Sequence, residues 1–351
     1  MKNDIKSMLP SELCEYFESI GEPSFRAQQV FSWLHQGVIK FADMTNLSLK
    51  LRNKLDEEFL ITVPELLEKL TSKSDSTVKH LWCVQEEDAI ESVLMDYEHG
   101  STVCLSTQVG CRMGCIFCAS AIGGLKRNLA ASEMVDQVLF SQIYAEKKVS
   151  NIVLMGMGEP LDNFENVMLF IELISHSYGI NIGARHITIS TCGVIENIDR
   201  LAEYGVQSGL AISLHAPDDE TRSKLVPINR EAGINSLLDA CGRYYRKTGR
   251  RITYEYAMID GVNDSPEQAA LLAKLLKNTG SHVNLISLSE VPERTLKASS
   301  KKSVDEFTGV LKQNGINLTI RRSLGTDIEA SCGQLRRKNL AEIVNGVMGD
   351  I

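Results

Sequence analysis

The sequence of 351 residues has no apolar run long enough to cross a membrane, because its longest apolar segments, such as 152–155 and 210–214, have only strand length. Residues 1–6 lack the apolar core of a signal peptide, so we expect a cytoplasmic protein. An excess of basic residues is also missing. The formal net charge of −8 argues against a protein that binds nucleic acid through phosphate neutralisation alone.

Local basic runs are nevertheless present. Residues 243–251 carry five Arg or Lys side chains with two tyrosines between them, and Arg336-Arg337-Lys338 follows near the end. These runs are candidate RNA contacts. A solvated helix face explains either run equally well.

Nine cysteines, an odd number, do not suit a disulfide framework in a chain without a secretory signal, so metal binding or catalysis is the expected use. Cys111, Cys115 and Cys118 lie so close that one turn brings three thiolates to one site. No fourth cysteine follows at short range. A 4Fe-4S cluster held by these three keeps one iron open, and radical S-adenosylmethionine (SAM) enzymes bind SAM at such an iron.

A structural zinc site is the alternative interpretation of these cysteines, with Cys104 as a fourth sulfur ligand. Structural zinc sites usually take pairs of ligands from two separate loops. Here three ligands come from one loop, and Cys104 lies in an apolar strand-like segment. We therefore favour the iron–sulfur cluster.

The hydrophobic pattern predicts an α/β protein. Residues 11–60 have helical spacing, and residues 70–106 change to a period of two, which predicts a small helical domain followed by a β-meander. Strand-like runs then alternate with helix-length segments, at 103–106, 151–155, 186–190, 210–214, 252–258, 283–287 and 318–320. Six β/α units and a closing strand are too few for a closed eight-stranded barrel, so we expect an open, partial (β/α)6 barrel.

This pattern divides the chain into four expected parts: a helical N-terminal domain at 1–70, a β-extension at 71–100, the barrel core at 101–325, and a C-terminal loop and tail at 326–351. Polar groups follow the expected barrel strands, where catalytic groups of such folds gather. Gly158 and Glu159 follow the strand at 151–155, and this carboxylate is suited to accept a hydrogen bond from the α-ammonium group of SAM. The next two strands end at Ser190 and at Ser213-Leu214-His215. A buried structural histidine explains His215 equally well.

Cys332 lies beyond the last expected strand and beside a glycine. A buried free thiol is the ordinary interpretation. On a loop at the rim of the barrel, however, the thiol is a candidate nucleophile, because a thiolate is readily alkylated by a sulfonium. Cys104 is then its natural partner for a transient disulfide. The remaining cysteines are interpreted as packing residues: Cys14, Cys83, Cys192 and Cys241.

Four motifs, taken in order, resemble the RlmN/Cfr family of radical SAM RNA methyltransferases. They are the cysteine loop, Gly-Met-Gly-Glu-Pro at 156–160, Ser-Leu-His-Ala-Pro at 213–217, and Ala-Ser-Cys-Gly-Gln-Leu at 330–335. The resemblance covers nearly the whole chain. It implies methylation of carbon 2 of adenosine 2503 in 23S rRNA and of adenosine 37 in tRNA, with a flavodoxin-type electron donor and a monomeric enzyme.

The resemblance also implies residue roles. Cys332 takes a methyl group from one SAM, and the radical formed from a second SAM at the cluster abstracts a hydrogen atom from that methyl group. Glu91 accepts the ring proton, and Cys104 releases the product by attacking the Cys332 sulfur. Cofactor contacts map to Gly158, Glu159, Ser190, Ser213, Leu214, His215 and Ser289.

Ser289 departs from the family, which usually has Asn at this position, and serine is shorter and offers fewer hydrogen-bonding groups. Three alternatives remain open at this point. One is methylation of carbon 8 of the same adenosine by the sister branch of the family. The second is a radical SAM enzyme that acts on a small molecule or a protein, and the third is a zinc-stabilised RNA-binding module.

Overall fold

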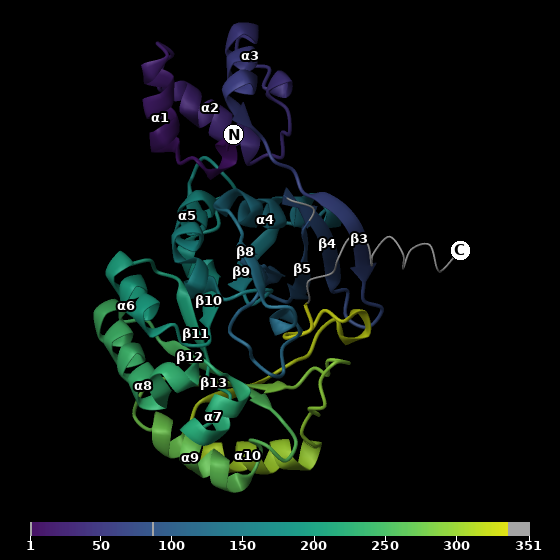
Figure 1. Cartoon of the computed structure of the whole chain (residues 1–351), viewed down its shortest axis with the longest axis vertical. Coiled ribbons are helices and arrows are strands. Elements are labelled where there is room, and N and C mark those ends of the chain that lie inside the picture. The colour runs from purple at the N-terminus through teal and green to yellow at the C-terminus, as the bar shows by residue number, and fades with distance from the viewer. Residues whose placement is uncertain (1, 86–87, 336–351) are drawn as a thin grey trace.

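A ten-stranded sheet, in the order β14-β13-β12-β11-β10-β9-β6-β5-β4-β3, forms the centre of the computed structural model, which describes residues 2–85 and 88–335 (Figure 1). Seven neighbouring strands of this sheet are parallel and curve into an open barrel. They are β6 (Gly100–Cys104), β9 (Val149–Leu154), β10 (Ile187–Thr191), β11 (Gly209–Ser213), β12 (Ile252–Met258), β13 (His282–Ser287) and β14 (Leu318–Arg321).

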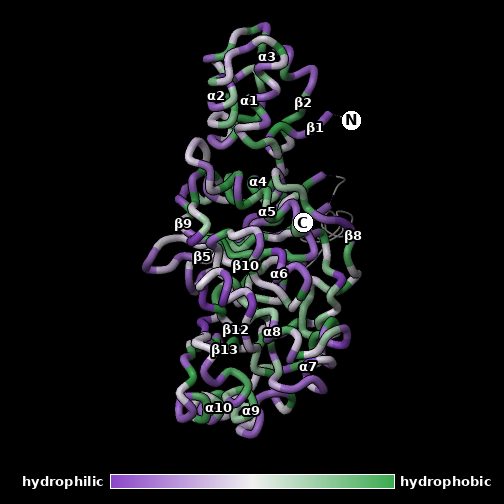
Figure 2. Tube along the Cα trace, turned by 90° about the vertical axis from the view of Figure 1, so that its left-hand side faces the viewer, coloured by the Kyte–Doolittle hydropathy of each residue, from purple (hydrophilic) through white to green (hydrophobic). Residues whose placement is uncertain are grey.

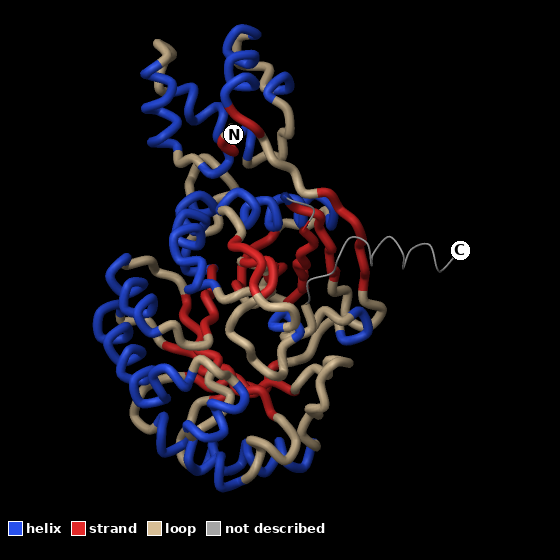
Figure 3. The backbone as a smooth tube through the Cα atoms, viewed as in Figure 1, coloured by secondary structure: helices blue, strands red, loops and turns tan. Residues whose placement is uncertain are grey.

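Helices connect these strands and cover the outer face of the barrel (Figure 3). They are α4 (Ala131–Ala145), α5 (Phe164–Ser175), α6 (Ile195–Tyr204), α7 (Asp219–Leu225), α8 (Asn229–Thr248), α9 (Pro266–Leu276) and α10 (Lys301–Gln313). The predicted series of six β/α units and a closing strand is confirmed. The start of α9 follows from its sequence, since Ser265 caps the helix by accepting from the Gln268 amide at 3.3 Å and Pro266 fits its first turn.

The alternation of side chains along β12 explains how one strand serves both faces. Tyr254 and Tyr256 are buried in the core between sheet and helices, where Tyr256 packs against Phe307 of α10 with ring centroids 5.2 Å apart. Glu255 and Ala257, at the intervening positions, line the barrel interior. The outer face of the strand therefore supplies stability, and its inner face supplies site residues.

The barrel is open because its sheet continues beyond β6 instead of pairing with β14. Antiparallel strands extend it, namely β5 (Asp88–Tyr97), β4 (Val78–Val84) and β3 (Glu65–Thr71). The predicted β-meander is confirmed, although its first strand begins at Glu65, before the predicted residue 70. A two-stranded sheet of β7 (Gln108–Gly110) and β8 (Leu125–Asn128) flanks the cysteine loop.

The N-terminal domain consists of α1 (Pro10–Ser19), α2 (Phe25–Leu34) and α3 (Leu49–Glu58), with the short parallel strands β1 (Asn3–Asp4) and β2 (Phe59–Leu60). Figure 2 shows it as a separate layer beyond α4 and α5. A buried ion pair joins it to the barrel, because Lys6 Nζ lies 2.5 Å from Asp136 Oδ2 on α4. No helix within 2–85 and 88–335 is long and apolar enough to span a membrane.

Candidate active site

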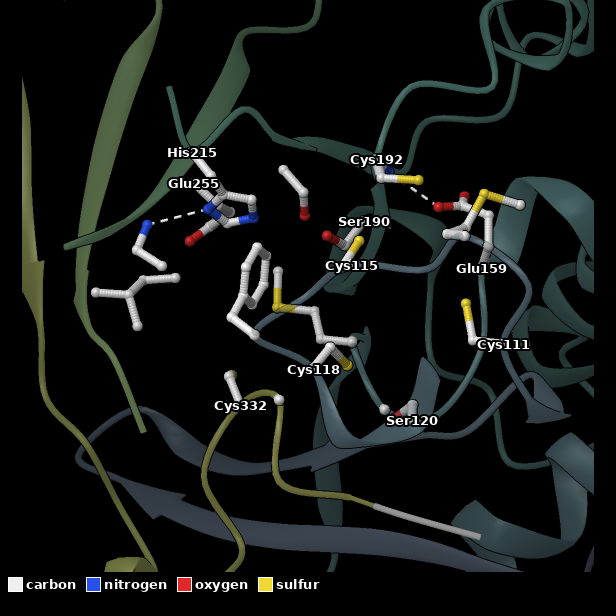
Figure 4. A pocket seen from close by; sticks show the side chains of 18 of the residues that line it. Cys111, Cys115, Cys118, Ser120, Glu159, Ser190, Cys192, His215, Glu255 and Cys332 are labelled. Carbon is white, nitrogen blue, oxygen red and sulfur yellow. Dashed lines mark hydrogen bonds between the residues drawn. The ribbon is translucent and has the colours of Figure 1, made fainter. Parts of the chain in front are cut away.

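The carboxyl ends of the parallel strands surround a cavity, here called the barrel cavity (Figure 4). It encloses about 940 Å³ of space free of protein atoms, open solvent at its mouth included. A volume of this order accommodates a nucleoside-sized ligand together with other groups. Ten predicted site residues line it: Cys111, Cys115, Cys118, Gly158, Glu159, Ser190, Ser213, His215, Ser289 and Cys332.

The cysteine loop enters this cavity because Gly110 lets the chain turn sharply. Gly110 has a φ of +79°, and a Cβ atom there would lie 2.0 Å from the Gly124 carbonyl oxygen. Burial raises the pKa of the Cys111 thiol to about 12, and it also raises the pKa values of Cys115 and Cys118. Three thiols, one buried and two partly buried, with open space before them are suited to a metal cluster, whose positive charge stabilises the thiolates.

The arrangement of sulfur donors also distinguishes a cluster from a single zinc ion. A 4Fe-4S cube takes each cysteine on a different iron, so its ligands need not converge on one point. Cys104, the fourth ligand that a zinc site requires, lies outside the barrel cavity. The residues present therefore fit a cluster better than zinc.

Gly158 and Glu159 lie at one end of the barrel cavity. Gly158 has a φ of +106°, and a Cβ atom there would lie 2.6 Å from the Gln108 Cβ, so the position accepts only glycine. Glu159 is buried, and its carboxylate accepts from the Leu161 amide at 3.0 Å and from the Cys192 amide at 2.9 Å. Burial raises the pKa of Glu159, and these hydrogen bonds oppose the rise. The carboxylate thus orders the backbone around the cavity.

His215 has a defined protonation state. Its Nδ1 accepts from the Ala257 amide at 3.0 Å, so the Nε2 atom carries the proton. Burial and, to a lesser extent, Arg222 lower the pKa of His215 to about 3. The ring is therefore a neutral hydrogen-bond donor. Leu214, by contrast, is fully buried and does not line the cavity, so its side chain belongs to the core.

Cys332 lies where two cavities meet. It lines the barrel cavity and also a smaller neighbouring space, the thiol cavity, together with Cys104, Ser289 and Arg321. Burial raises the pKa of the Cys104 thiol to about 12, the nearby Cys332 raises it further, and Arg321 opposes the rise. Cys332 is the main cause of a raised pKa at Arg321. The two thiols and one guanidinium thus form a single electrostatic group.

The loop that carries Cys332 is bonded to the cysteine loop. The Ala119 amide donates to the Gly333 carbonyl at 2.8 Å, and the Ser120 hydroxyl donates to the Leu335 carbonyl at 2.6 Å. Figure 4 shows Cys332 pointing into the barrel cavity from this loop. The predicted cluster ligands and the predicted nucleophile therefore lie on two hydrogen-bonded loops that line the barrel cavity together.

The structure does not bring Glu91 into either cavity. Its side chain is 1% exposed, and Oε1 lies 3.3 Å from Lys79 Nζ. The same ammonium group donates to the Glu329 carbonyl at 3.2 Å, three residues before Cys332. Glu91 is thus connected through Lys79 to the loop that carries the thiol.

Sequence reasoning missed three residues of this region. Arg321 lines both cavities, Glu255 lines the floor of the barrel cavity, and Cys192, interpreted as a packing residue, lines that cavity as well. A charged residue at the inward position of an otherwise apolar strand was the available signal for Glu255 and Arg321. No sequence signal separates Cys192 from the packing cysteines.

The basic run at 243–251 is partly neutralised within the protein. Arg243 Nη2 lies 2.7 Å from Asp199 Oδ2, and Lys247 Nζ lies 2.5 Å from Glu203 Oε1, both acids being on α6. This pairing favours the interpretation of the run as a solvated helix face. The triplet Arg336-Arg337-Lys338 lies outside the described residues.

Comparison with known proteins agrees with this geometry. Residues 105–273 match the radical SAM superfamily, and residues 4–61 match the ribosomal RNA large subunit methyltransferase N-terminal domain. A Lachnoclostridium phytofermentans protein named "probable dual-specificity RNA methyltransferase RlmN" is 48% identical over 98% of both chains. The chain belongs to the RlmN family of radical SAM RNA methyltransferases.

Other RlmN relatives and a solved structure support this membership. A Clostridium botulinum protein of the same name is 49% identical over 96% of this chain and 97% of its own. A radical SAM methyltransferase from Sphaerobacter thermophilus has a crystal structure that superposes with a TM-score of 0.91, at 43% identity, covering 95% of this chain and 99% of that chain. The predicted family and fold are confirmed, and a zinc-stabilised RNA-binding module is no longer a competing interpretation.

Proposed function

We propose that this RNA methyltransferase transfers a methyl group to carbon 2 of adenosine 2503 in 23S rRNA and of adenosine 37 in tRNA, with Cys332 carrying the carbon. The observation that carries the proposal is the position of Cys332, which lines the barrel cavity with the three loop cysteines and the thiol cavity with Cys104. This position supports a role in which one sulfur receives a methyl group on one side and is attacked by a thiolate on the other.

In this proposal Cys111, Cys115 and Cys118 would hold the 4Fe-4S cluster. SAM occupies the remainder of the barrel cavity, with its amino-acid end at Gly158 and Glu159. Ser190, Ser213, His215 and Ser289 line the rest of the space, and Leu214 contributes through its backbone. When bound, the cluster and a second SAM supply the one-electron chemistry that removes a hydrogen atom from the methyl group on Cys332.

Cys332 begins the reaction as a nucleophile. Its thiolate attacks the methyl carbon of SAM, the bond from that carbon to the sulfonium breaks, and S-adenosylhomocysteine leaves with the electron pair. Arg321 lines both cavities together with Cys332. Carbon 2 of adenine is not nucleophilic, so the carbon must be activated on the enzyme before it reaches the base.

Cys104 ends the reaction. Once the CH2 group has bonded to carbon 2 of the base, the Cys104 thiolate attacks the Cys332 sulfur and a disulfide forms. The bond from Cys332 to the CH2 group breaks, its electron pair stays on that carbon, and uptake of a proton completes the methyl group. Glu91 is proposed as the acceptor of the ring proton on the family pattern, and its position beside Lys79 is outside both cavities. The adenosine must leave its stack to reach Cys332, as for other enzymes that act on a ring atom.

The remaining parts of the proposal concern partners. The N-terminal domain (1–70) contacts the RNA, the β-extension (71–100) and barrel (101–325) form the catalytic unit, and the segment 326–351 carries the thiol. The enzyme acts as a monomer in the cytoplasm, and a flavodoxin-type protein supplies its electrons. The family membership supports RNA as the substrate.

The position of the new methyl group tests the proposal. Anaerobically reconstituted enzyme is incubated with a 23S rRNA fragment or tRNA, SAM and a reductant, and the digested RNA is analysed by mass spectrometry. We expect 2-methyladenosine. A methyl group on carbon 8 refutes the regiochemistry and indicates the sister activity, and unmodified adenosine with an intact cluster refutes the proposed function.

Cysteine variants test the mechanism separately. Cys332→Ala is expected to lose methylation and retain some reductive cleavage of SAM. Cys104→Ala is expected to remain covalently joined to RNA, which a denaturing gel detects. Cys241→Ala is the matched control, because this thiol is buried on α8 away from both cavities and its variant should methylate normally. Normal methylation by the Cys332 variant contradicts the carrier role.

A further inference from the structure

The floor of the barrel cavity contains a carboxylate with an unused oxygen. Glu255 on β12 is 4% exposed and lines the cavity. Its Oε1 accepts from Asn284 Nδ2 at 3.0 Å, whereas its Oε2 has no hydrogen-bond partner among the described residues. A buried carboxylate oxygen without a partner is costly, because its hydration is lost without replacement.

The register of the sheet fixes where this carboxylate stands. Ser213 of β11 pairs with Glu255, and Glu255 pairs with Asn284 of β13, so these three residues form one row across the barrel interior. The next row toward the carboxyl ends contains Ala257, Ile286 and Arg321. Glu255 therefore lies one row deeper than Arg321.

Charge in this region keeps the carboxylate usable as an acceptor. Burial raises the pKa of Glu255, and the guanidinium of Arg321 opposes this rise, with a further contribution from the Asn284 hydrogen bond. Because Asn284 holds one oxygen in place, the other oxygen is directed away from β13. A carboxylate fixed in this way is prepared for a hydrogen-bond donor that enters from the cavity.

We infer that Glu255 is a binding residue for the ribose hydroxyls of the adenosyl group in this cavity. The inference rests on the proposed function in taking SAM as the ligand. Glu159 and Glu255 lie at opposite ends of the cavity (Figure 4), so a SAM whose amino-acid end is at Glu159 extends its nucleoside toward Glu255. Carboxylates hold ribose hydroxyls in the same manner in dinucleotide-binding folds.

Two adenosines enter this enzyme, one in SAM and one in the RNA, and both carry a ribose. The position of Glu255 favours SAM, because Glu255 lines only the barrel cavity of the two, whereas the thiol cavity, with Cys104 and Cys332, is reached by Arg321 of the next row, and the RNA base must reach Cys332. His215, a neutral donor on the same wall, complements the carboxylate acceptor. Together they offer both kinds of hydrogen bond to one nucleoside.

The test measures binding instead of turnover. Glu255→Gln preserves shape, and because Asn284 continues to donate to the side-chain oxygen, the new amide turns its NH2 group toward the cavity. Holoenzyme, reconstituted without oxygen, is dialysed to equilibrium against S-adenosylhomocysteine and its 2′-deoxy and 3′-deoxy forms. Loss of one hydrogen bond to a charged group weakens binding about tenfold or more. Glu220→Gln, on an exposed part of α7, is the matched control.

We expect Glu255→Gln to raise the Kd of S-adenosylhomocysteine about tenfold and to lose the preference of the native enzyme for the ribose hydroxyl that Glu255 contacts. Iron content and circular dichroism confirm that the variant is folded and loaded. An unchanged Kd overturns the inference. So does a loss of affinity that is equal for S-adenosylhomocysteine and both of its deoxy forms. A variant that binds S-adenosylhomocysteine normally but RNA weakly also overturns it, by assigning Glu255 to the RNA ribose. These results stand whether the enzyme methylates carbon 2 or carbon 8.

Discussion

Removing one partner of the Lys6–Asp136 ion pair should loosen the N-terminal domain from the barrel. The side chains are only 3% and 2% exposed, and Lys6 Nζ lies 2.6 Å and 2.5 Å from the two carboxylate oxygens of Asp136. Asp136→Leu leaves an ammonium group buried without its counter-charge. Breaking such a pair costs about 3–5 kcal/mol. Because Lys6 also donates to the Thr62 carbonyl, which the change leaves intact, we expect the lower end, about 3 kcal/mol.

The double variant Lys6→Met/Asp136→Leu distinguishes loss of the pair from loss of packing. It replaces both charges by apolar groups of similar size, and such replacements are often neutral or stabilising by about 1–4 kcal/mol. We therefore expect the double variant to recover most of the stability that the single variant loses. Lys6→Met alone also leaves a buried charge without its partner, so the magnitude of the interaction energy in the double-mutant cycle should be at least about 3 kcal/mol.

Urea unfolding followed by circular dichroism gives the free energies, and limited proteolysis reports whether the N-terminal domain opens first. Two structural units need not unfold in one step, so the two measurements are compared. Lys224→Met is the control, because Lys224 and its partner Glu220 are 68% and 82% exposed. Loss of this surface pair should change the free energy of unfolding by less than about 0.5 kcal/mol. The reasoning is refuted if Asp136→Leu lowers the free energy of unfolding by less than about 1 kcal/mol, or if the double variant is less stable than the single variant.

Three further predictions concern the cavity and the core. Gly158→Ala should weaken SAM binding, because the alanine Cβ would lie 2.6 Å from the Gln108 Cβ and displace the chain there. Equilibrium dialysis measures the affinity for SAM, and an unchanged affinity contradicts the prediction. Burial lowers the pKa of His35 from 6.5 to about 4. Between pH 6.5 and pH 4 the unfolded chain therefore binds a proton at His35 that the folded chain does not bind, so the free energy of unfolding should fall as the pH drops through this range. His35→Phe should reduce that fall in urea midpoints compared at pH 7 and pH 5, and an equal fall in both proteins counts against His35. Cys115→Ser should lose iron and the brown colour after anaerobic reconstitution while Cys83→Ser keeps both, and equal iron content in the two variants argues against the cluster site.

The barrel was predictable from sequence because each of its strands is an apolar run that a helix-length segment follows. The strand at 252–258 has the same bounds in the structure as in the prediction, since Tyr254, Tyr256 and Met258 are buried by the helices. The N-terminal helices were predictable from the spacing of Leu13 and Phe17 for the same reason. Short elements were not predictable: β7, for example, has only three residues and therefore gives no periodic signal.

The cysteine loop was predictable as a site because its three thiols are close in sequence. Arg321 and Glu255 each place a charge in a strand-like run, but the cavity that they line was not predictable, because it depends on neighbouring strands that lie far away along the chain. The ion pairs between α6 and α8 were not predictable for the same reason, and these pairs neutralise Arg243 and Lys247. The roles of Glu91 and Ser289 stay predictions from the family pattern.

The bonds between the cysteine loop and the Cys332 loop have a consequence for how the enzyme matures. During synthesis, Cys111, Cys115 and Cys118 leave the ribosome long before Gly333 and Leu335, whose carbonyls accept from Ala119 and Ser120. The bonds that join the two loops can therefore form only after residues 333–335 have been made.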